Sequence, residues 1–238
     1  MFDISLPDLL ALAYFLAAWF AYSIVVERSA HGGESLNSLM HGYRDRWMLE
    51  MLGRPMRMVD GQVTASLQNG AAFFASTSLI AVGGTLTLLR SADEILTVVS
   101  VLPFSSPPTR VLWEGKMMGL AIIFVYAFFK FAWSYRLYNY VAILIGAAPP
   151  VEEKDTPHAR ALAHRTAHIC ADAGRHFNRG QRAFFFALGY LGWFLGPIPL
   201  ALSTTAIVWV IYRRQFYSES RRAFDTTPDI DKPSLPPV

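Results

Sequence analysis

The feature that most constrains this chain is a long apolar run close to its start. The run reads PDLLALAYFLAAWFAYSIVV, from Pro7 to Val26, and Asp8 is its one charged residue. An α-helix rises 1.5 Å per residue, so about 20 apolar residues cross a hydrocarbon core of about 30 Å. The run therefore predicts a membrane-spanning helix over residues 7–26.

Three further stretches are long and apolar enough to do the same. They cover residues 70–89, 111–129 and 183–212. Charged residues make up only 16% of the chain, against about 25% in ordinary soluble domains. We therefore predict an all-α fold, in which residues 1–238 form a single membrane domain. This domain is an integral membrane helical bundle of about four transmembrane helices.

The distribution of basic residues orients the predicted helices. Lys and Arg accumulate in the cytoplasmic connections of membrane proteins. Residues 27–62 and 149–182 are rich in arginine, whereas the N-terminal tail has no basic residue and the connection 90–110 has only its two terminal arginines. This alternation predicts cytoplasmic segments at 27–62 and 149–182. It places the N-terminus on the opposite side, which is the periplasm if the chain resides in the inner membrane of a bacterium.

The polar tail, residues 213–238, conflicts with this pattern. Four crossings place the tail outside, yet it carries basic residues such as Arg213 and Arg221. The fourth apolar stretch is interrupted by GPIP at residues 196–199, where proline favours a kink or a break. The plainer interpretation is one kinked helix. The alternative is a re-entrant hairpin, which returns the tail to the cytoplasm.

Two helical extensions are predicted on the cytoplasmic side. Residues 36–58 place apolar side chains such as Leu39 and Trp47 at three- and four-residue steps, which predicts an amphipathic helix that ends near GRP at 53–55. This helix either lies in the membrane interface or packs against the protein's own bundle. The third span is free of proline up to residue 148, so we expect its helix to continue beyond the membrane.

A row of histidines recurs at helical spacing in the second cytoplasmic segment. The sequence HRTAHICADAGRH places His164, His168, Asp172 and His176 at every fourth position. A DTP signal precedes the row and is typical of a helix start, so the four side chains lie along one face. Two imidazoles one turn apart can share a metal ion. The row therefore raises the question of a metal site.

Only part of this row can bind one ion. The four positions extend about 18 Å along a helix, whereas metal–ligand bonds measure about 2.0–2.2 Å. A candidate site uses His164 with His168, or His168 with Asp172, and takes its other ligands from His31 and His41. The competing interpretation is a solvated or hydrogen-bonded polar face. Apart from such a divalent metal, we expect no cofactor.

Two long blocks of the sequence resemble a known family. They are WMLEMLGRPMRMVDGQVTASLQNGAAFFASTSLIAVGG at residues 47–84 and HFNRGQRAFFFALGYLGWFLGP at residues 176–197. They resemble the two signature blocks of an uncharacterised membrane-protein family, domain of unknown function 599, which occurs in bacteria and plants. The resemblance covers nearly the whole chain. It implies a multi-span helical membrane protein and supplies no assigned activity and no catalytic residues.

Both blocks bring polar residues to the predicted cytoplasmic face of the membrane. These residues are Arg57, Asp60, His176, Asn178 and Arg182. One interpretation is a binding site for an anionic headgroup or ligand. The simpler interpretation is a network of ion pairs and hydrogen bonds that locks two helices together. The sequence FNRG, which begins directly after His176, also predicts a turn before the last span.

The second span is rich in small and hydroxylated residues, such as Ser76, Gly83 and Gly84. Small residues let helices approach closely, so we expect this helix at the packing centre of the bundle.

Glu114 and Lys116 lie near the predicted outer end of the third span. The predicted spans otherwise hold almost no ionisable residues. The acidic residue expected of a proton-coupled transporter is therefore lacking.

The sequence contains no catalytic constellation. The leading hypothesis is a non-catalytic membrane protein that acts by association, as a homo-oligomer or as an accessory subunit, with membrane lipids, itself or other membrane subunits as partners. A channel or passive transporter is the alternative, and a metal-dependent membrane enzyme that uses His164 and His168 is the third. The calculated pI near 9.1 suits anionic lipid headgroups and not nucleic acid, because no aromatic-interleaved basic domain is present.

Overall fold

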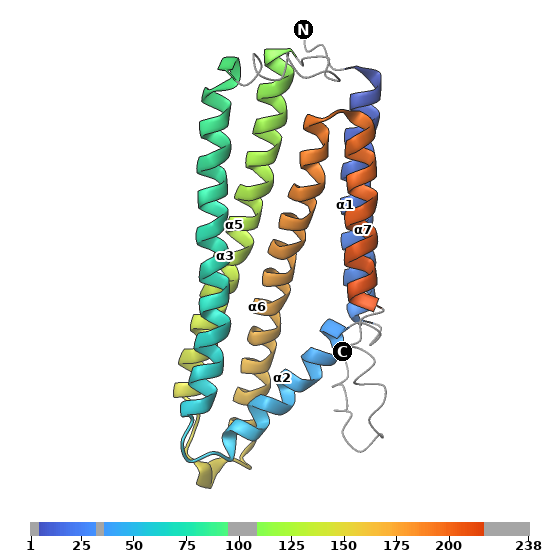
Figure 1. The fold of residues 1–238 in the computed structure, drawn as a ribbon. Helices are drawn as coiled ribbons and strands as arrows, with labels where there is room; N and C mark the ends of the chain where they lie inside the picture. Colours follow the sequence, from blue (N-terminus) through green and yellow to red (C-terminus); the bar gives the residue numbers. More distant parts are fainter. Residues whose placement is uncertain (1–4, 32–35, 95–108, 217–238) are drawn as a thin grey trace. The chain divides into compact units, whose positions relative to one another are not determined.

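The computed structural model describes residues 5–31, 36–94 and 109–216. The described chain is helical and contains no strand, which confirms the all-α prediction. The principal helices are α1 (Leu6–His31), α2 (Leu36–Leu52), α3 (Met58–Arg90), α5 (Arg110–Gly146), α6 (Pro157–Tyr190) and α7 (Pro197–Phe216), joined in part by the short 3-10 helices η1 (Val151–Glu153) and η2 (Leu191–Phe194) (Figure 1).

Three of the described helices are long and apolar enough to cross a membrane. They are Leu6–Val26 within α1, Met58–Arg90 and Arg110–Gly146. The first matches the predicted span, and α3 and α5 contain the second and third. The helix α5 continues to Gly146, close to the predicted end at residue 148. The polar tail 213–238 lies largely outside the described residues.

The fourth predicted span, 183–212, is not one helix. Instead α6 ends at Tyr190, η2 follows, and α7 begins at Pro197. The break centres on Gly196, whose φ of 132° is accessible to glycine and strained for other residues. Pro197 then suits the first position of a helix. The expectation of a single kinked helix is therefore wrong. The observed interruption covers residues 191–196 and overlaps the expected 196–199 only at Gly196.

The turn expected at FNRG is also wrong. The helix α6 runs through residues 177–180 without interruption. Gly180 is tolerated inside this helix because a glycine in a helix interior costs only about 1 kcal/mol relative to alanine. As a result, α6 is a single helix that carries both the histidine row and the start of the second family block.

The helices group into two compact units. Unit 1 comprises Met1–Ile24, Ala75–Phe129 and Arg179–Ile211, and unit 2 comprises Val25–Phe74, Lys130–Asn178 and Tyr212–Val238. In unit 1, the ring of Phe15 on α1 meets the rings of Phe186 and Tyr190 on α6 edge to face. Such aromatic pairs add to the apolar burial that joins these helices.

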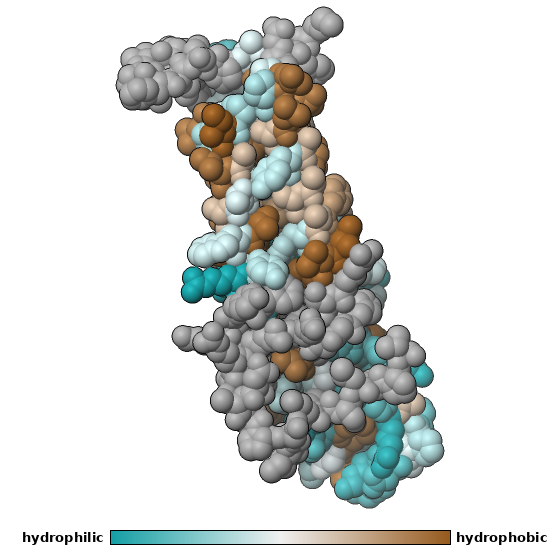
Figure 2. Space-filling view, turned by 90° about the vertical axis from the view of Figure 1, so that its right-hand side faces the viewer, coloured by the Kyte–Doolittle hydropathy of each residue, from teal (hydrophilic) through white to brown (hydrophobic). Residues whose placement is uncertain are grey.

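In unit 1 the helices α1 and α7 run side by side (Figure 1). A hydrogen bond of 2.8 Å joins the hydroxyls of Tyr14 and Thr205. The outer surface of this pair is apolar, and Figure 2, which views their side, shows hydrophobic residues gathered there. Phe20, Leu202 and Trp209 are exposed examples. An exposed apolar surface of this kind is expected of helices that contact lipid.

The helix α3 is not the packing centre that its small residues predict. Only 11% of the residues in its most apolar stretch are buried, against 39% in the corresponding stretch of α5. A Cβ atom added to Gly83 or Gly84 meets no neighbouring atom within 4 Å. The small residues of this part of α3 therefore lie on an open face.

The core of unit 2 joins α2 to α5 and α6. The helix α6 contributes a buried row of small side chains, which includes Ala159, Ala163 and Ala167. Such a row lets a neighbouring helix approach closely, and α2 fills the space with Met48 and Met51, both fully buried. Of the two positions that the sequence left open for α2, the contacts favour packing against the protein's own helices.

Candidate functional site

The histidine row lies on α6, on a face that meets α2. The predicted start of α6 is confirmed, because Pro157 is its first residue and the Thr156 hydroxyl accepts a hydrogen bond from the Ala159 N–H at 3.2 Å. His164 Nδ1 lies 2.7 Å from Asp45 Oδ1 on α2. One turn further along α6, the ring of His168 meets that of His41 edge to face, with centroids 5.7 Å apart.

These contacts join the polar residues in separate pairs. Asp172 forms an ion pair with Arg175 on its own helix, so His164, His168 and Asp172 do not converge on one point. Among the residues that the structure describes, no three His, Cys, Asp or Glu side chains are placed to hold a metal ion. His41 does approach the row, as proposed for a supplementary ligand, whereas the side chain of His31 lies outside the described residues.

The surroundings of His41 make its titration a test of the contact between α2 and α6. Burial is the largest cause that lowers the pKa of His41 below 6.5, and the neighbouring His168, Arg175 and Arg44 lower it further, against a backbone hydrogen bond that raises it. The unfolded chain therefore binds more protons than the folded chain as the pH falls through about 6.5. The contribution of neutral His41 to stability is complete above that pH. It decreases as the pH falls toward the folded pKa.

We expect His41→Gln to flatten the pH dependence of this contact. In the unsubstituted protein, hydrogen exchange of the α2 amides, corrected for the intrinsic rate, should accelerate when the pH is lowered from about 7.5 to about 5. In His41→Gln the acceleration should be smaller. His158→Gln, at an exposed position on the first turn of α6, is the matched control. An unchanged pH profile in His41→Gln contradicts the prediction.

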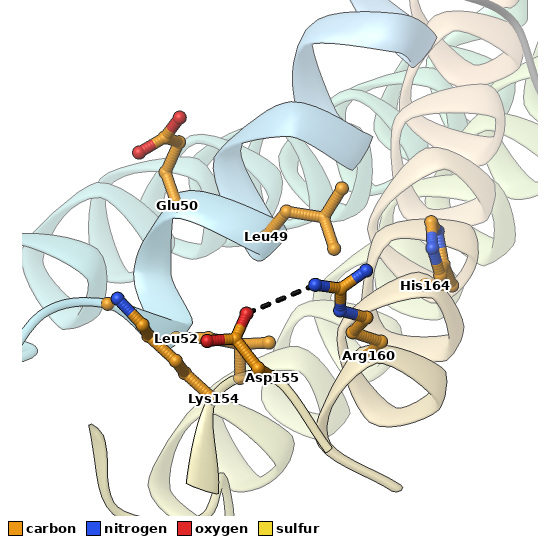
Figure 3. Close-up of a pocket in the computed structure, with 8 residues that line it drawn as sticks. Leu49, Glu50, Leu52, Lys154, Asp155, Arg160 and His164 are labelled. Carbon is orange, nitrogen blue, oxygen red and sulfur yellow. Dashed lines mark hydrogen bonds and ion pairs between the residues drawn. The ribbon is translucent and has the colours of Figure 1, made fainter. Parts of the chain in front are cut away.

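A cavity of about 370 Å³ opens beside this row, where the end of α2 meets the start of α6. Its walls come from α2, from the residues after η1 and from the first turns of α6 (Figure 3). The lining residues are Leu49, Glu50, Leu52, Gly53, Lys154, Asp155, Arg160 and His164. Figure 3 shows the Asp155 carboxylate turned toward the Arg160 guanidinium, and their atoms are 3.0 Å apart. The cavity therefore combines charged groups of both signs with an apolar wall.

Two members of the predicted polar cluster, Arg57 and Asp60, lie at the start of α3. Asp60 is fully buried, and its Oδ1 accepts hydrogen bonds from Trp47 Nε1 at 2.7 Å and from Arg54. Arg57 donates to the backbone carbonyls of Ala148, at 2.7 Å, and Pro149. Both carbonyls belong to the connection that follows α5, which ends at Gly146. These contacts fasten the start of α3 to the connection after α5 and to α2.

The other three members lie elsewhere. The ring of Phe177, next to His176 on α6, meets that of Phe74. Phe74 is fourteen residues beyond Asp60 on α3, about 21 Å along the axis. Asn178 is adjacent to Phe177 on α6, whereas Arg182 belongs to unit 1. His176 and Asn178 therefore lie away from Arg57 and Asp60, and the ring of His176 contacts that of Trp133.

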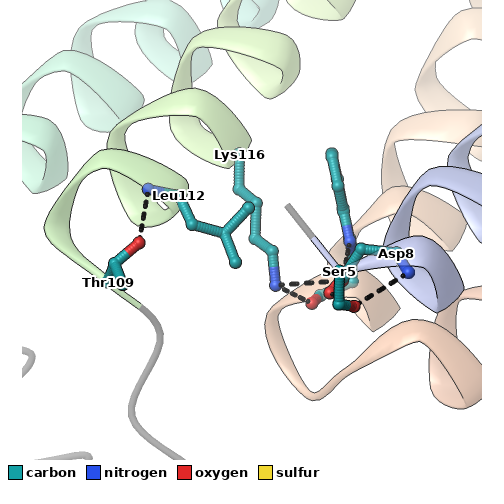
Figure 4. Close-up of polar contacts among 6 residues, drawn as sticks. Ser5, Asp8, Thr109, Leu112 and Lys116 are labelled. Atoms are coloured by element: carbon teal, nitrogen blue, oxygen red, sulfur yellow. Dashed lines mark hydrogen bonds and ion pairs between the residues drawn. The ribbon is translucent and has the colours of Figure 1, made fainter. Parts of the chain in front are cut away.

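Unit 1 contains a polar site that the sequence did not single out, in which Asp8 of α1 and Lys116 of α5 are both buried. Lys116 Nζ donates a hydrogen bond of 2.7 Å to the backbone carbonyl of Trp193 and lies 4.0 Å from Asp8 Oδ1. The same Oδ1 accepts the indole N–H of Trp193 at 2.7 Å, and Asp8 Oδ2 accepts the Ser5 hydroxyl at 2.5 Å (Figure 4). The site joins α1, α5 and η2.

The sequence carried a signal for this site. Asp8 is the one charged residue in the first apolar run, and Lys116 lies a short distance inside the third. Each position taken alone is consistent with a solvated helix end. Their pairing depends on Trp193, which contacts both side chains from η2. The sequence did not predict η2, because residues 183–212 were expected to form one span.

The fold and these sites define an all-α protein with helices capable of crossing a membrane. The family model described as "Protein of unknown function, DUF599" matches residues 10–220 of the chain. The chain therefore belongs to this family, as the two sequence blocks predicted. A comparison with curated proteins gave no match, and a comparison with solved structures gave none.

Proposed function

We propose that the protein is a non-catalytic membrane protein that acts by association, as a homo-oligomer formed through α3. The observation that carries the proposal is the open face of α3 in unit 1. Ser76, Gly83, Gly84 and Thr87 are all exposed there, as is the larger Ile80, and no atom beyond the helix's own backbone lies within 4 Å of a Cβ added to either glycine. A membrane-length helix with such a face is suited to contact another helix.

The chemistry of the face favours a second copy of the same chain. Between helices in lipid, close van der Waals contact and hydroxyl hydrogen bonds stabilise association, and small residues permit that approach. The face has no charged side chain between Ser76 and Thr87 that would select a partner of opposite charge. In a two-fold dimer the same surface patch of each copy meets the other, so this face would contact its own counterpart. We place the assembly in a bacterial inner membrane, with 27–62 and 149–182 cytoplasmic.

We expect Gly83→Leu combined with Gly84→Leu to weaken the oligomer about tenfold or more, because bulky side chains prevent the close approach. The measurement is native mass spectrometry of the full chain, released gently from membranes. Gly115→Leu on α5 is the matched control, since Gly115 is also exposed and open. A monomeric unsubstituted protein contradicts the proposal. An assembly with other chains would instead indicate an accessory subunit.

A channel is the second candidate, and it rests on the same face. Ser76 and Thr87 present hydroxyl groups there, although the Thr87 hydroxyl already donates to the Gly83 carbonyl at 3.0 Å. Several copies arranged with these faces toward a common axis would line a path with weakly polar groups. Solute or ion flux into vesicles that contain the purified protein, above that into empty vesicles, would favour this candidate.

A further inference from the structure

We propose that the cavity between α2 and α6 binds a small water-soluble zwitterion of the amino-acid type, a molecule with a primary ammonium group and a carboxylate. This site is independent of the oligomer contact proposed for α3. The inference rests on three properties of the cavity: its fixed walls, its balanced charges and its apolar side.

Part of each wall of the cavity is fixed by contacts outside it. Leu52 belongs to the buried core of unit 2, and the Gly53 N–H donates to the Glu50 carbonyl at 3.2 Å, which shapes the turn after α2. On the opposite wall, His164 is held by Asp45 at 2.7 Å. The volume of about 370 Å³ lies in the range of sites for small molecules, about 300–1,000 Å³. The cavity is therefore preformed and large enough for an amino acid.

The charges that line the cavity cancel. Lys154 and Arg160 supply two positive groups, and Glu50 and Asp155 supply two negative groups. A simple anion placed there meets two carboxylates, and a simple cation meets two basic side chains, so each is opposed by part of the wall. Asp155 and Arg160 neutralise each other at 3.0 Å, and a molecule that carries both signs complements the remaining Lys154 and Glu50. Charge balance thus selects a zwitterion over either simple ion.

The arrangement of the groups fits the two ends of such a molecule. Lys154 and Asp155 follow η1 at the base of the cavity, Arg160 and His164 line the α6 side, and Glu50 lies on the α2 side (Figure 3). Asp155 and Arg160 pair with each other at 3.0 Å, so Lys154 is left to bind a carboxylate and Glu50 to bind an ammonium group. Leu49 and Leu52 remain for an apolar side chain. Leucine is therefore a suitable probe.

The position of the cavity favours a soluble ligand over a lipid headgroup. The third predicted span ends near residue 129, and α5 continues from Lys130 to Gly146 before the chain reaches Lys154. This part of α5 is about 25 Å long at 1.5 Å per residue. A headgroup at the predicted membrane surface does not reach so far, because the polar region adds only about 5–8 Å on each side of the hydrocarbon core.

Isothermal titration calorimetry of the full chain in nanodiscs tests the proposal with four probes. Leucine carries both charges, leucinamide lacks the carboxylate, N-acetyl-leucine lacks the ammonium group, and phosphoethanolamine represents a lipid headgroup. We expect leucine to bind at least about tenfold more tightly than the other three, because each loses charge-assisted hydrogen bonds or the apolar contact. Equal binding of leucine and its two derivatives overturns the proposal. So does binding of phosphoethanolamine without binding of leucine.

Substitutions in the wall locate the site. We expect Lys154→Gln and Glu50→Gln each to weaken leucine binding about tenfold or more. Arg165→Gln and Glu152→Gln are the matched controls, because both residues are exposed near the cavity without lining it. Leucine binding that survives both wall substitutions, or no leucine binding at all by the unsubstituted chain, overturns the proposal. The oligomeric state, measured on the same samples, separates this result from the proposal for α3.

Discussion

Lys116→Met is expected to lower the free energy of unfolding of unit 1 by about 3 kcal/mol or more. The ammonium group of Lys116 lies 4.0 Å from the carboxylate of Asp8, and the two side chains are only 5% and 11% exposed. Removing one partner of a buried ion pair leaves the other charge uncompensated, at a cost of about 3–5 kcal/mol. The substitution also removes the hydrogen bond of 2.7 Å to the Trp193 carbonyl.

The measurement is equilibrium unfolding of the membrane-reconstituted protein, for example by steric trapping. Glu114→Gln is the control, because Glu114 is half-exposed in its ion pair with Arg110 and surface pairs contribute only about 0–1 kcal/mol. We expect Asp8→Asn combined with Lys116→Met to be less harmful than the sum of the single substitutions, since no isolated charge remains. A Lys116→Met protein as stable as the Glu114→Gln control contradicts the role assigned to the pair.

The sequence predicted the elements whose signals are local. The run from Pro7 to Val26 is apolar over the length of a span, and α1 begins at Leu6. The DTP signal placed the start of α6 correctly, and α2 ends at Leu52, directly before the GRP signal that was expected to end it. In these places the chain's own capping and composition decide the structure, so no knowledge of neighbouring elements is needed.

The sequence did not predict the features that depend on contacts between helices. The small residues of α3 predicted a central helix, yet a small side chain is equally compatible with an open face, and Gly83 and Gly84 have no close neighbour in the structure. Hydropathy likewise could not separate one long span from the end of α6 followed by α7. The break depends on the backbone conformation of Gly196.

For the candidate sites, too, the sequence predicted local features and did not predict contacts between helices. The helical face of His164 and His168 was predicted from spacing, but the partner of His164 is Asp45 on α2, 119 residues away in sequence. The cluster of Arg57, Asp60, His176, Asn178 and Arg182 was inferred from their common position near predicted span ends. Because α6 is continuous, His176 lies far from the start of this helix and away from Arg57 and Asp60.

Gly192→Ala is expected to destabilise the hairpin of α6 and α7 by about 3 kcal/mol. A Cβ atom at this position lies 2.4 Å from Ser203 Oγ and 2.7 Å from the Pro199 carbonyl oxygen. The second contact involves the backbone at the start of α7, which cannot move as a flexible side chain does. Ser203 is also held in place, because its hydroxyl donates to the Gly189 carbonyl at 2.6 Å.

Gly115→Ala is the matched control for this substitution, because a Cβ atom there meets nothing within 4 Å. In a helix interior the change from glycine to alanine is favourable by up to about 1 kcal/mol, so the two variants should differ in sign when unfolding is measured under identical conditions. A Gly192→Ala protein as stable as Gly115→Ala would show that η2 and α7 separate at little cost. The carbonyl of Trp193 would then no longer be held in place for Lys116, and the burial of the Asp8–Lys116 pair would depend on α1 and α5 alone.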